Sequence, residues 1–384
     1  MEFFICPKCG NSNPKYIGYK NGEPYCRFCI TLRGDNANEY DYSGNEVELS
    51  LNYNLSKEQK EISERVIFNF KRGYDTLINA VCGAGKTELV YGVIEYALKR
   101  HLSICFAIPR KDVVIELEER IKSAFPNNTV VAVYGGNTRI LTGDIVLCTT
   151  HQLFRYPNYF DLIILDEIDA FPFANNHLLE CMYLRSKRGN AVLMSATPSI
   201  DVIKEFSKPN HEILELNIRF HHKDIPVPKI IIRPYYLKFI YLVKFLKKCQ
   251  KEDKQVLVFA PTIFHAETLY SSLSFYVDKG NYVHSKKTDR SQIITDFKKK
   301  KYSYLVSTAV LERGVTLKNL QVVVYEADHN IYDTKSLIQI SGRVGRKLDA
   351  YEGEVIFLAN TVSKSMEKAR KNIIGKNKYL QNMF

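Results

Sequence analysis

The sequence contains no tryptophan and no long apolar run. A membrane-spanning helix needs about 20 consecutive apolar residues, so no segment is expected to cross a bilayer. The first residues also lack the basic stretch and the apolar core of a secretory signal peptide. We therefore expect a cytoplasmic protein. Without tryptophan, any stacking on nucleobases would fall to the 25 tyrosines and 21 phenylalanines.

Acidic residues are too few to balance the basic ones, because 42 Asp and Glu face 54 Lys and Arg. The net charge of +12 favours a polyanionic partner, either nucleic acid or an anionic membrane surface. The 45% apolar content excludes a disordered chain, which would lack the apolar surface needed to fold. At roughly 150 residues per domain, 384 residues suggest two or three domains.

The nine cysteines do not suit a disulfide framework, because the number is odd and the chain is expected to be cytosolic. Four of them form two C-x2-C pairs, Cys6 with Cys9 and Cys26 with Cys29, and sixteen residues separate the pairs. Each pair directs two thiolates at one point, and two pairs supply the four sulfurs of a tetrahedral Zn²⁺ site. The surrounding segment is poor in apolar residues, so zinc is expected to supply its folding energy.

Beyond residue 48, short apolar runs rich in β-branched residues alternate with helix-like segments. This alternation predicts βαβ units and parallel sheets, and the continuous apolarity of the runs indicates strands that are covered on both faces. The expected strands of a first series are residues 76–81, 103–108, 130–134, 145–149, 162–165 and 191–194. Those of a second series are residues 255–259, 282–284, 304–307, 322–325 and 354–358.

A proline-bearing stretch at residues 224–234 separates the two series. We therefore predict an α/β protein in which two parallel-sheet domains follow a small zinc module. The expected parts are a zinc module and linker at 1–48, a first domain at 49–222, a second domain at 223–372 and a tail at 373–384.

A glycine-rich turn lies between an expected strand and an expected helix, which is the context of a phosphate-binding loop. Gly83 and Gly85 would let backbone N–H groups close around phosphate oxygens, and the helix N-terminus would add positive charge. Lys86 would reach the β- and γ-phosphates of ATP, and Thr87 would hold Mg²⁺. The strict loop pattern begins with glycine, where this chain has Ala80.

Two adjacent acids, Asp166 and Glu167, follow the fully apolar strand at residues 162–165. Asp166 would coordinate Mg²⁺, and Glu167 would orient or deprotonate the attacking water. In the second domain, Arg343 and Arg346 lie three residues apart, which is about one turn of a helix. Such arginines stabilise the charge that develops as the phosphoryl group leaves. The catalytic set is therefore expected to be divided between the two domains.

The order of these motifs over residues 55–346 resembles the helicase superfamily 2 pattern. The resemblance implies two RecA-like domains with ATP in the cleft between them. It also implies a nucleic-acid strand across the carboxyl ends of both sheets. Gln59 resembles the glutamine that reads adenine, and Gln339 belongs with the two arginines in the last motif. Ser195 and Thr197 resemble the residues that couple the ATP state to strand binding.

The same resemblance, together with positions directly after expected strands, implies a set of nucleic-acid contacts. They would come from backbone amides, hydroxyls and a basic side chain, which bind phosphates without reading bases. The candidates are Arg110, Gly135, Gly136, Thr149 and Thr308. The chain departs from the superfamily pattern at Ile340, where an arginine is frequent, and at Ala309, where many members carry aspartate.

A narrower resemblance is to the late-competence ATPase family ComFA, in which a four-cysteine zinc module precedes a compact motor. The motifs that carry it are residues 108–113, 149–153, 166–169 and 310–316. The resemblance implies a DNA-stimulated ATPase that pulls transforming single-stranded DNA into the cytoplasm at the inner face of the cell membrane. It also implies partners in the competence machinery, namely the DNA-uptake channel and a ComFC-type protein. It leaves open whether the chain forms a homo-oligomer.

Other functions remain open. A replication-restart helicase of the PriA type, or another DNA helicase, could share the second domain, although PriA chains are longer and carry their cysteines inside the motor. A DEAD-box RNA helicase would have alanine at Ile168 and histidine at Gln339. A catalytically silent scaffold could bind nucleic acid through its zinc module and basic surface. Against the scaffold, Lys86, Thr87 and Glu167 are all present.

Overall fold

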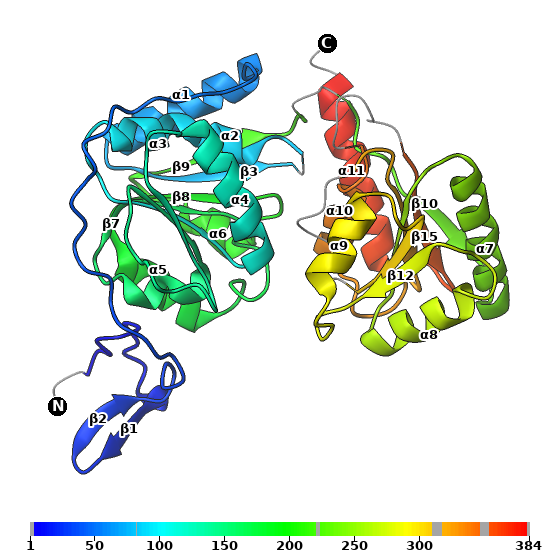
Figure 1. Ribbon diagram of the computed structural model, residues 1–384, viewed down its shortest axis with the longest axis horizontal. Helices are drawn as coiled ribbons and strands as arrows, with labels where there is room; N and C mark the ends of the chain where they lie inside the picture. The colour runs from blue at the N-terminus through cyan, green and yellow to red at the C-terminus, as the bar shows by residue number, and fades with distance from the viewer. Residues whose placement is uncertain (1–3, 82, 220–222, 309–316, 346–352, 382–384) are drawn as a thin grey trace. The chain divides into compact units, whose positions relative to one another are not determined.

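The computed structural model describes residues 4–81, 83–219, 223–308, 317–345 and 353–381 (Figure 1). The chain forms two compact units, Met1–Leu216 and Asn217–Phe384. No helix in these described ranges is long and apolar enough to cross a membrane.

The first unit contains a parallel sheet in the order β5-β6-β4-β7-β8-β3-β9. Its strands are β3 (Asp75–Ala80), β4 (Ile104–Ile108), β5 (Val130–Val133), β6 (Ile145–Thr149), β7 (Phe160–Leu165), β8 (Lys187–Ser195) and β9 (His211–Leu216). The intervening helices are α1 (Lys57–Lys71), α2 (Lys86–Leu89), α3 (Tyr91–Leu98), α4 (Lys111–Ala124), the 3-10 helix η2 (Thr150–Arg155), α5 (His177–Ser186) and α6 (Ile200–Glu205). The central strands are buried along their whole length, as strands covered on both faces require.

The second unit contains a parallel sheet in the order β10-β15-β14-β11-β13-β12. Its strands are β10 (Lys229–Ile232), β11 (Val256–Phe259), β12 (Gly280–Val283), β13 (Tyr304–Ser307), β14 (Gln321–Tyr325) and β15 (Val355–Ala359). Its helices are α7 (Tyr235–Lys251), α8 (Ile263–Leu273), α9 (Arg290–Lys298), α10 (Thr334–Ser341) and α11 (Lys364–Gln381). Buried side chains of α7 and α8 share one core with the sheet, while those of α9, α10 and α11 belong to a second core.

The two sheets have the same topology. Numbered by their order of appearance within each unit, the strands lie in the order third, fourth, second, fifth, sixth, first in both sheets, and β9 extends the first sheet at its edge. The helix α7 therefore follows the first strand of its unit, as α2 follows β3. The chain leaving β14 occupies the same topological position as the chain leaving β7.

The N-terminal part is a small hairpin of β1 (Ile17–Lys20) and β2 (Glu23–Cys26), preceded by a 3-10 turn, η1 (Pro14–Tyr16). Asn21 and Gly22 at its tip both have positive φ, as a two-residue hairpin turn requires. Its four motif cysteines belong to the same buried cluster as Leu153 and Phe154 of η2, so the module packs against the rest of the first unit.

The predicted fold class is confirmed, because parallel sheets with intervening helices form two tandem units behind a four-cysteine cluster. Each strand of the two predicted series is present. Two outer strands were not predicted. The stretch that separates the predicted series contains β10, and β9 closes the other end of the first sheet.

Candidate functional site

The loop between β3 and α2 contains the two glycines of the candidate phosphate-binding turn. Gly83 and Gly85 have φ of 86° and 76°, a left-handed conformation that favours glycine. A Cβ at Gly85 would lie 2.5 Å from the side-chain nitrogen of Gln59, so no larger residue fits without displacing that side chain.

Gln59 supports this loop from α1. Its Nε2 donates to the carbonyl of Ala84 at 2.9 Å, and its Oε1 accepts from the backbone N–H of Ser56 at 3.0 Å. The Ser56 hydroxyl in turn accepts from the Gln59 N–H, which completes a capping box at the start of α1. Both ends of the amide are engaged by the protein, so recognition of adenine would require Gln59 to exchange one of these bonds.

Lys86 and Asp166 are brought together by the sheet order, because β3 and β7 flank the same strand, β8. The Lys86 Nζ lies 3.6 Å from the Asp166 Oδ1, and both side chains are largely buried. Burial raises the pKa of Asp166, and the charge of Glu167 acts in the same direction, whereas the Lys86 ammonium opposes them. Thr87 is buried in the next position of α2. A basic group and a carboxylate therefore meet beside the glycine-rich turn, and Thr87 is the next residue of α2 after Lys86.

Glu167 has a φ of 57°, which is a strained conformation for a residue with a side chain. Its backbone N–H donates to the Asp166 Oδ1 at 2.7 Å. The chain therefore turns sharply at the end of β7, and the two acids sit at the carboxyl edge of the sheet. Strain of this kind is concentrated at functional sites.

Asp169 connects the acidic turn to the end of β8 and the residues directly after it. Its two carboxylate oxygens accept hydrogen bonds from the hydroxyls of Ser195 and Thr197, each at 2.8 Å. The Thr197 N–H also donates to the Ser195 hydroxyl at 3.0 Å. The sequence motifs contain all three residues, but sequence reasoning gave Asp169 no role. The spacing of its motif could have identified it as the acceptor for the two hydroxyls.

In the second unit, Gln339 lies within α10 and Arg343 in the turn that follows it, and both are buried. Arg346 and the family segment at residues 310–316 lie outside the described residues. The turn is held by Arg219, whose Nη1 donates to the carbonyls of Val344 at 3.0 Å and Gly345 at 2.8 Å. Sequence reasoning missed Arg219, because a single arginine outside any motif carries no signal.

The candidate strand contacts of the first unit lie along one half of its sheet edge. Arg110 follows β4, Gly136 with its neighbour Gly135 follows β5, and Thr149 ends β6. These three strands are adjacent in the order β5-β6-β4. Both glycines are exposed, and a Cβ at either would meet nothing within 4 Å, so their backbone is open to a ligand. Thr308 occupies the matching position after β13 in the second unit and is buried.

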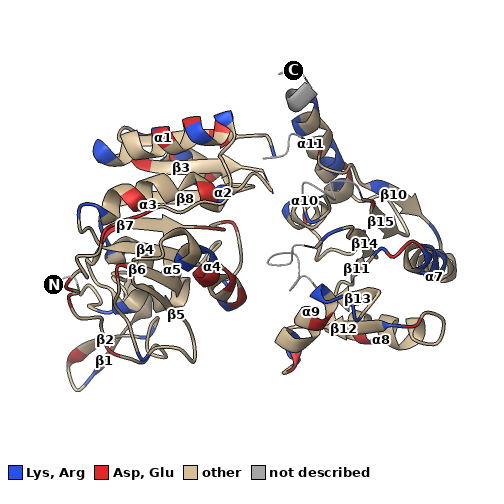
Figure 2. Cartoon of the chain, turned by 45° about the horizontal axis from the view of Figure 1, so that its top comes forward, with Lys and Arg blue, Asp and Glu red and all other residues tan. Residues whose placement is uncertain are grey.

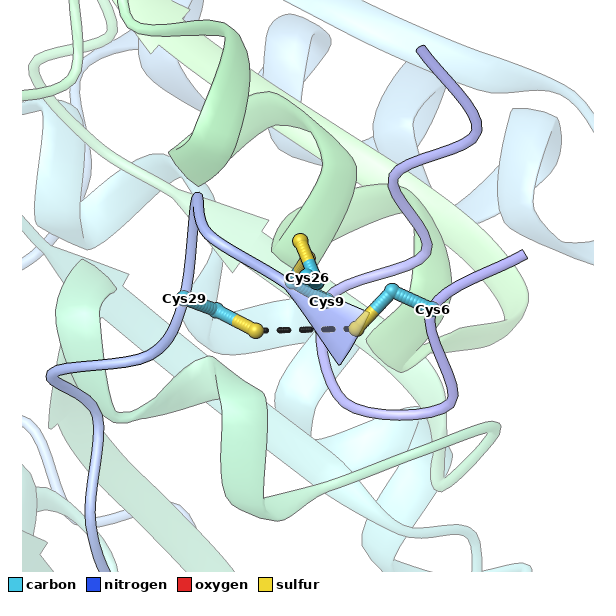
Figure 3. A group of neighbouring side chains, drawn as sticks. All are labelled: Cys6, Cys9, Cys26 and Cys29. Carbon is cyan, nitrogen blue, oxygen red and sulfur yellow. Dashed lines mark hydrogen bonds between the residues drawn. The ribbon is translucent and has the colours of Figure 1, made fainter. Parts of the chain in front are cut away.

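The four cysteines of the N-terminal module converge on one point (Figure 3). All four thiols are buried, and their sulfurs lie within 4.8 Å of one another. The Sγ atoms of Cys6 and Cys29 are 3.5 Å apart, and those of Cys9 and Cys26 are 3.7 Å apart. A tetrahedral Zn²⁺ with Zn–S bonds of 2.3 Å has sulfur–sulfur edges of about 3.8 Å, so the donor set fits zinc.

The cysteine module is attached to the first unit by polar contacts as well as by its buried sulfurs. The Arg185 guanidinium on α5 donates to the carbonyl of Lys8 at 2.6 Å. Arg155 at the end of η2 donates to the carbonyl of Asp35 at 2.9 Å, and its own carbonyl accepts from Ala37. The polar stretch after the module, which we interpreted as a linker, therefore runs along the first unit.

Basic residues are concentrated on particular helices (Figure 2). The helix α7 carries five lysines and no acidic residue, and α11 carries six basic residues and one glutamate. Part of the net positive charge therefore lies on these two helices of the second unit.

The chain is similar to known proteins over nearly its full length. It is 31% identical to the competence protein ComFA of Streptococcus pneumoniae, over 97% of this chain and 90% of that protein. It is 30% identical to the competence protein ComFA of Bacillus subtilis, over 96% of this chain and 85% of that protein. Family models match at residues 52–200 (type III restriction enzyme, res subunit) and 237–347 (helicase conserved C-terminal domain).

Solved structures share the fold at low sequence identity. Dbp5 of S. cerevisiae bound to RNA and ADP BeF3 aligns with a TM-score of 0.62 at 16% identity, over 85% of this chain and 97% of that chain. The Mycobacterium smegmatis helicase Lhr bound to ssDNA and AMP-PNP aligns with a TM-score of 0.63 at 17% identity, over 85% of this chain and 50% of that chain. Both similarities confirm the tandem RecA-like architecture.

Proposed function

Because the chain belongs to the ComFA family of competence proteins and is a superfamily 2 helicase-type ATPase, we propose that it is an ATP-driven motor on single-stranded DNA that draws transforming DNA into the cell. One observation carries this proposal. The candidate phosphate-binding residues follow β3 and β7, and the candidate strand-contact residues lie at the ends of β4, β5 and β6, so the strand order puts the two sets on adjoining halves of one sheet edge. We call these the phosphate-binding half (β7-β8-β3) and the strand-contact half (β5-β6-β4).

In the phosphate-binding half, this chain's residues would hold ATP and Mg²⁺. Lys86 and the backbone N–H groups of the loop bind phosphate oxygens, while Thr87 and Asp166 hold the cation. The cation would neutralise phosphate charge during hydrolysis. Glu167 orients the attacking water and accepts its proton. Arg343 and Arg346 stabilise the charge on the leaving phosphoryl group.

The network of Asp169, Ser195 and Thr197 would transmit the state of this half to the strand-contact half. It joins the turn that carries Asp166 to the segment after β8 through two hydroxyl–carboxylate hydrogen bonds. A displacement of the acidic turn during hydrolysis would therefore be passed directly to Ser195 and Thr197. If this part of the protein has two arrangements, and DNA and ATP both bind more tightly to the same one, the binding of each favours the binding of the other.

In the strand-contact half, Arg110, the Gly135–Gly136 backbone and Thr149 would contact phosphates, and Thr308 would do so in the second unit. Such contacts carry no base information, so binding should be nearly independent of sequence and strongly weakened by salt. The net charge of +12 supports a polyanionic ligand. The Lhr helicase, which shares this fold, is bound to ssDNA in its solved structure, and this supports a single-stranded DNA ligand.

The four-cysteine module would hold one structural Zn²⁺, which the sulfur spacing and burial support. We propose that residues 1–48 form this module and its linker, 49–222 the ATP-binding domain and 223–372 the second motor domain. Residues 373–381, part of the expected tail at 373–384, continue α11. The family supports a place at the cytoplasmic face of the membrane, with the DNA-uptake channel and a ComFC-type protein as partners and with self-association as a further option.

The test is the rate of ATP hydrolysis with single-stranded DNA, duplex DNA and RNA in parallel. We expect single-stranded DNA to stimulate hydrolysis most, and Arg343→Ala to abolish the stimulated rate while ATP and DNA still bind. Better stimulation by RNA would leave an ATP-driven motor in place but contradict a role in DNA uptake. Hydrolysis that no nucleic acid stimulates would contradict the motor itself.

A further inference from the structure

The second unit contains a lysine–carboxylate pair in the same topological position as the pair at the ATP site. Lys238 lies in the first turn of α7, the helix that follows the first strand of its unit, and its Nζ is 3.5 Å from Oε1 of Glu326. Glu326 directly follows β14, as Asp166 directly follows β7. The corresponding distance from Lys86 to Asp166 is 3.6 Å. Glu326 has a φ of 55°, the same strained conformation that Glu167 has.

A pocket of about 420 Å³ opens at this position, in the range typical of small-ligand sites. Its walls come from three segments that leave the carboxyl edge of the sheet. They are Tyr235 and Tyr236 of α7, Phe264 and His265 of α8, and Tyr325 and Glu326 at the end of β14. Ligands of open α/β sheets bind at this edge.

The aromatic walls of the pocket face solvent to an unusual degree. Tyr235, Tyr236 and Phe264 are 65%, 66% and 71% exposed, although large aromatic side chains normally bury most of their surface. Lys238 is fully buried beside this wall, with its ammonium 5.2 Å from the centre of the Tyr325 ring and 5.7 Å from that of Tyr235. Among the described residues the ammonium makes no hydrogen bond, so the aromatic rings and Glu326 are its surroundings.

The chain between β10 and α7 differs from the ATP site in one decisive respect. Only Arg233 and Pro234 connect the two elements, so there is no glycine-rich loop to surround a phosphate. Pro234 also lacks a backbone N–H. The pocket thus has the same position and the same lysine–carboxylate pair as the candidate ATP site, but aromatic rings are present in place of a phosphate-binding loop. These features suit a nucleobase, a flat heterocycle, that belongs to a strand whose phosphates are bound outside the pocket.

We propose that this pocket receives a base of the bound single-stranded DNA, stacked against Phe264 and Tyr236. The inference rests on the proposed function, because it requires the chain to bind such a strand. Phe259 at the end of β11 is paired with Ser307 at the end of β13. The chain enters α8 after β11, and Thr308 follows β13, so the start of α8 and the strand-contact candidate Thr308 leave neighbouring strands at the same edge of the sheet. A strand held at Thr308 can therefore place a base over α8. Glu326 supplies an acceptor for the amino group of cytosine or adenine.

The absence of tryptophan permits a direct test, because Phe264→Trp and Phe275→Trp would each give a protein with a single tryptophan. Phe275 is 83% exposed in the same unit but does not line the pocket, so it serves as a matched control. Each protein is titrated with a single-stranded oligonucleotide, with an abasic oligonucleotide of equal length, and with free adenosine. Strand binding is followed independently by fluorescence anisotropy of a labelled oligonucleotide.

We expect the base-bearing strand to quench the tryptophan at position 264, and the abasic strand and adenosine to leave it unchanged. The tryptophan at position 275 should respond to none of them. In addition, Phe264→Ala should weaken binding of the base-bearing strand by about tenfold and leave the abasic strand unaffected, which is the scale of one lost stacking contact. Phe264→Tyr should restore the affinity.

Two results would overturn the inference while leaving the proposed function intact. One is strand binding without quenching at position 264, which would show that no base stacks on the aromatic wall. The other is quenching by free adenosine to the same extent, which would assign the pocket to a free nucleoside. By contrast, wild-type protein that fails to bind the oligonucleotide would overturn the proposed function together with the pocket.

Discussion

Arg219 donates from its guanidinium to the carbonyl of Gly345 at 2.8 Å. It makes further bonds to the carbonyls of Val344 and Gly342, so one fully buried side chain holds the turn that carries the arginine motif. Arg219 lies three residues after Leu216, the last residue of the first unit. Arg219 therefore links the start of the second unit to the turn that carries Arg343.

Arg219→Ala should lower the free energy of unfolding by about 2–3 kcal/mol, because buried carbonyls would lose their donor. Arg219→Lys should recover only part of this loss, since an ammonium cannot reproduce the planar fork of a guanidinium. The measurement is urea unfolding followed by circular dichroism. Equal stability of the wild-type and alanine proteins would show that water replaces the guanidinium.

The sequence identifies the elements whose signal is local. Continuous apolar runs predicted the central strands, and the glycine-rich turn before Lys86 predicted the phosphate loop. β10 was missed because Pro226, Pro228 and Pro234 surround its short apolar run, so the segment reads as a linker. The pairing of Lys238 with Glu326 could not be predicted, since the two residues are distant in the sequence and belong to no motif. Only the sheet order brings them together.

Lys86→Ala should abolish ATP hydrolysis and leave binding of single-stranded DNA largely intact. Lys86 supplies the charge next to Asp166, whereas the strand-contact candidates lie on the other half of the sheet edge. The measurements are phosphate release and fluorescence anisotropy of a labelled oligonucleotide. Lys99→Ala is a matched control, because Lys99 is exposed and paired only with Glu95 of its own helix in the described part of the chain. Hydrolysis near the wild-type rate in Lys86→Ala would contradict the site.

Glu167→Gln should retain ATP while turnover falls by a factor of about 10² or more, the scale of a lost general base. The amide keeps the shape of the side chain but accepts no proton. Nucleotide binding is measured with a fluorescent ATP analogue, and turnover by phosphate release. If binding and turnover decreased together, Glu167 would serve the conformation of the strained turn instead of the chemistry.

Replacing Cys6 and Cys9 by serine should release one zinc ion per chain, because two remaining thiolates cannot maintain a tetrahedral site. The sheet of the first unit should still fold, since its core includes many residues outside the module. The module should become sensitive to protease, with cleavage expected before residue 48. Zinc is measured by elemental analysis. An intact protein without zinc would contradict the assignment of the metal.

Asp169→Ala should separate basal hydrolysis from its stimulation by DNA. The substitution leaves the hydroxyls of Ser195 and Thr197 without their shared acceptor, so the acidic turn and the segment after β8 lose their connection. Asp169→Asn is the control for charge. It removes the negative charge that raises the pKa of Asp166 but can still form hydrogen bonds with both hydroxyls.

We therefore expect Asp169→Ala to hydrolyse ATP within a few-fold of the basal wild-type rate and to lose stimulation, and Asp169→Asn to keep most of the stimulation. The double substitution of Ser195 and Thr197 by alanine should reproduce the Asp169→Ala result, because it breaks the same two bonds from the other side. Phosphate release with and without single-stranded DNA distinguishes the cases. If both Asp169 variants lost basal hydrolysis equally, the charge of Asp169 would serve catalysis, and the connection between the two halves of the sheet edge would have to lie elsewhere.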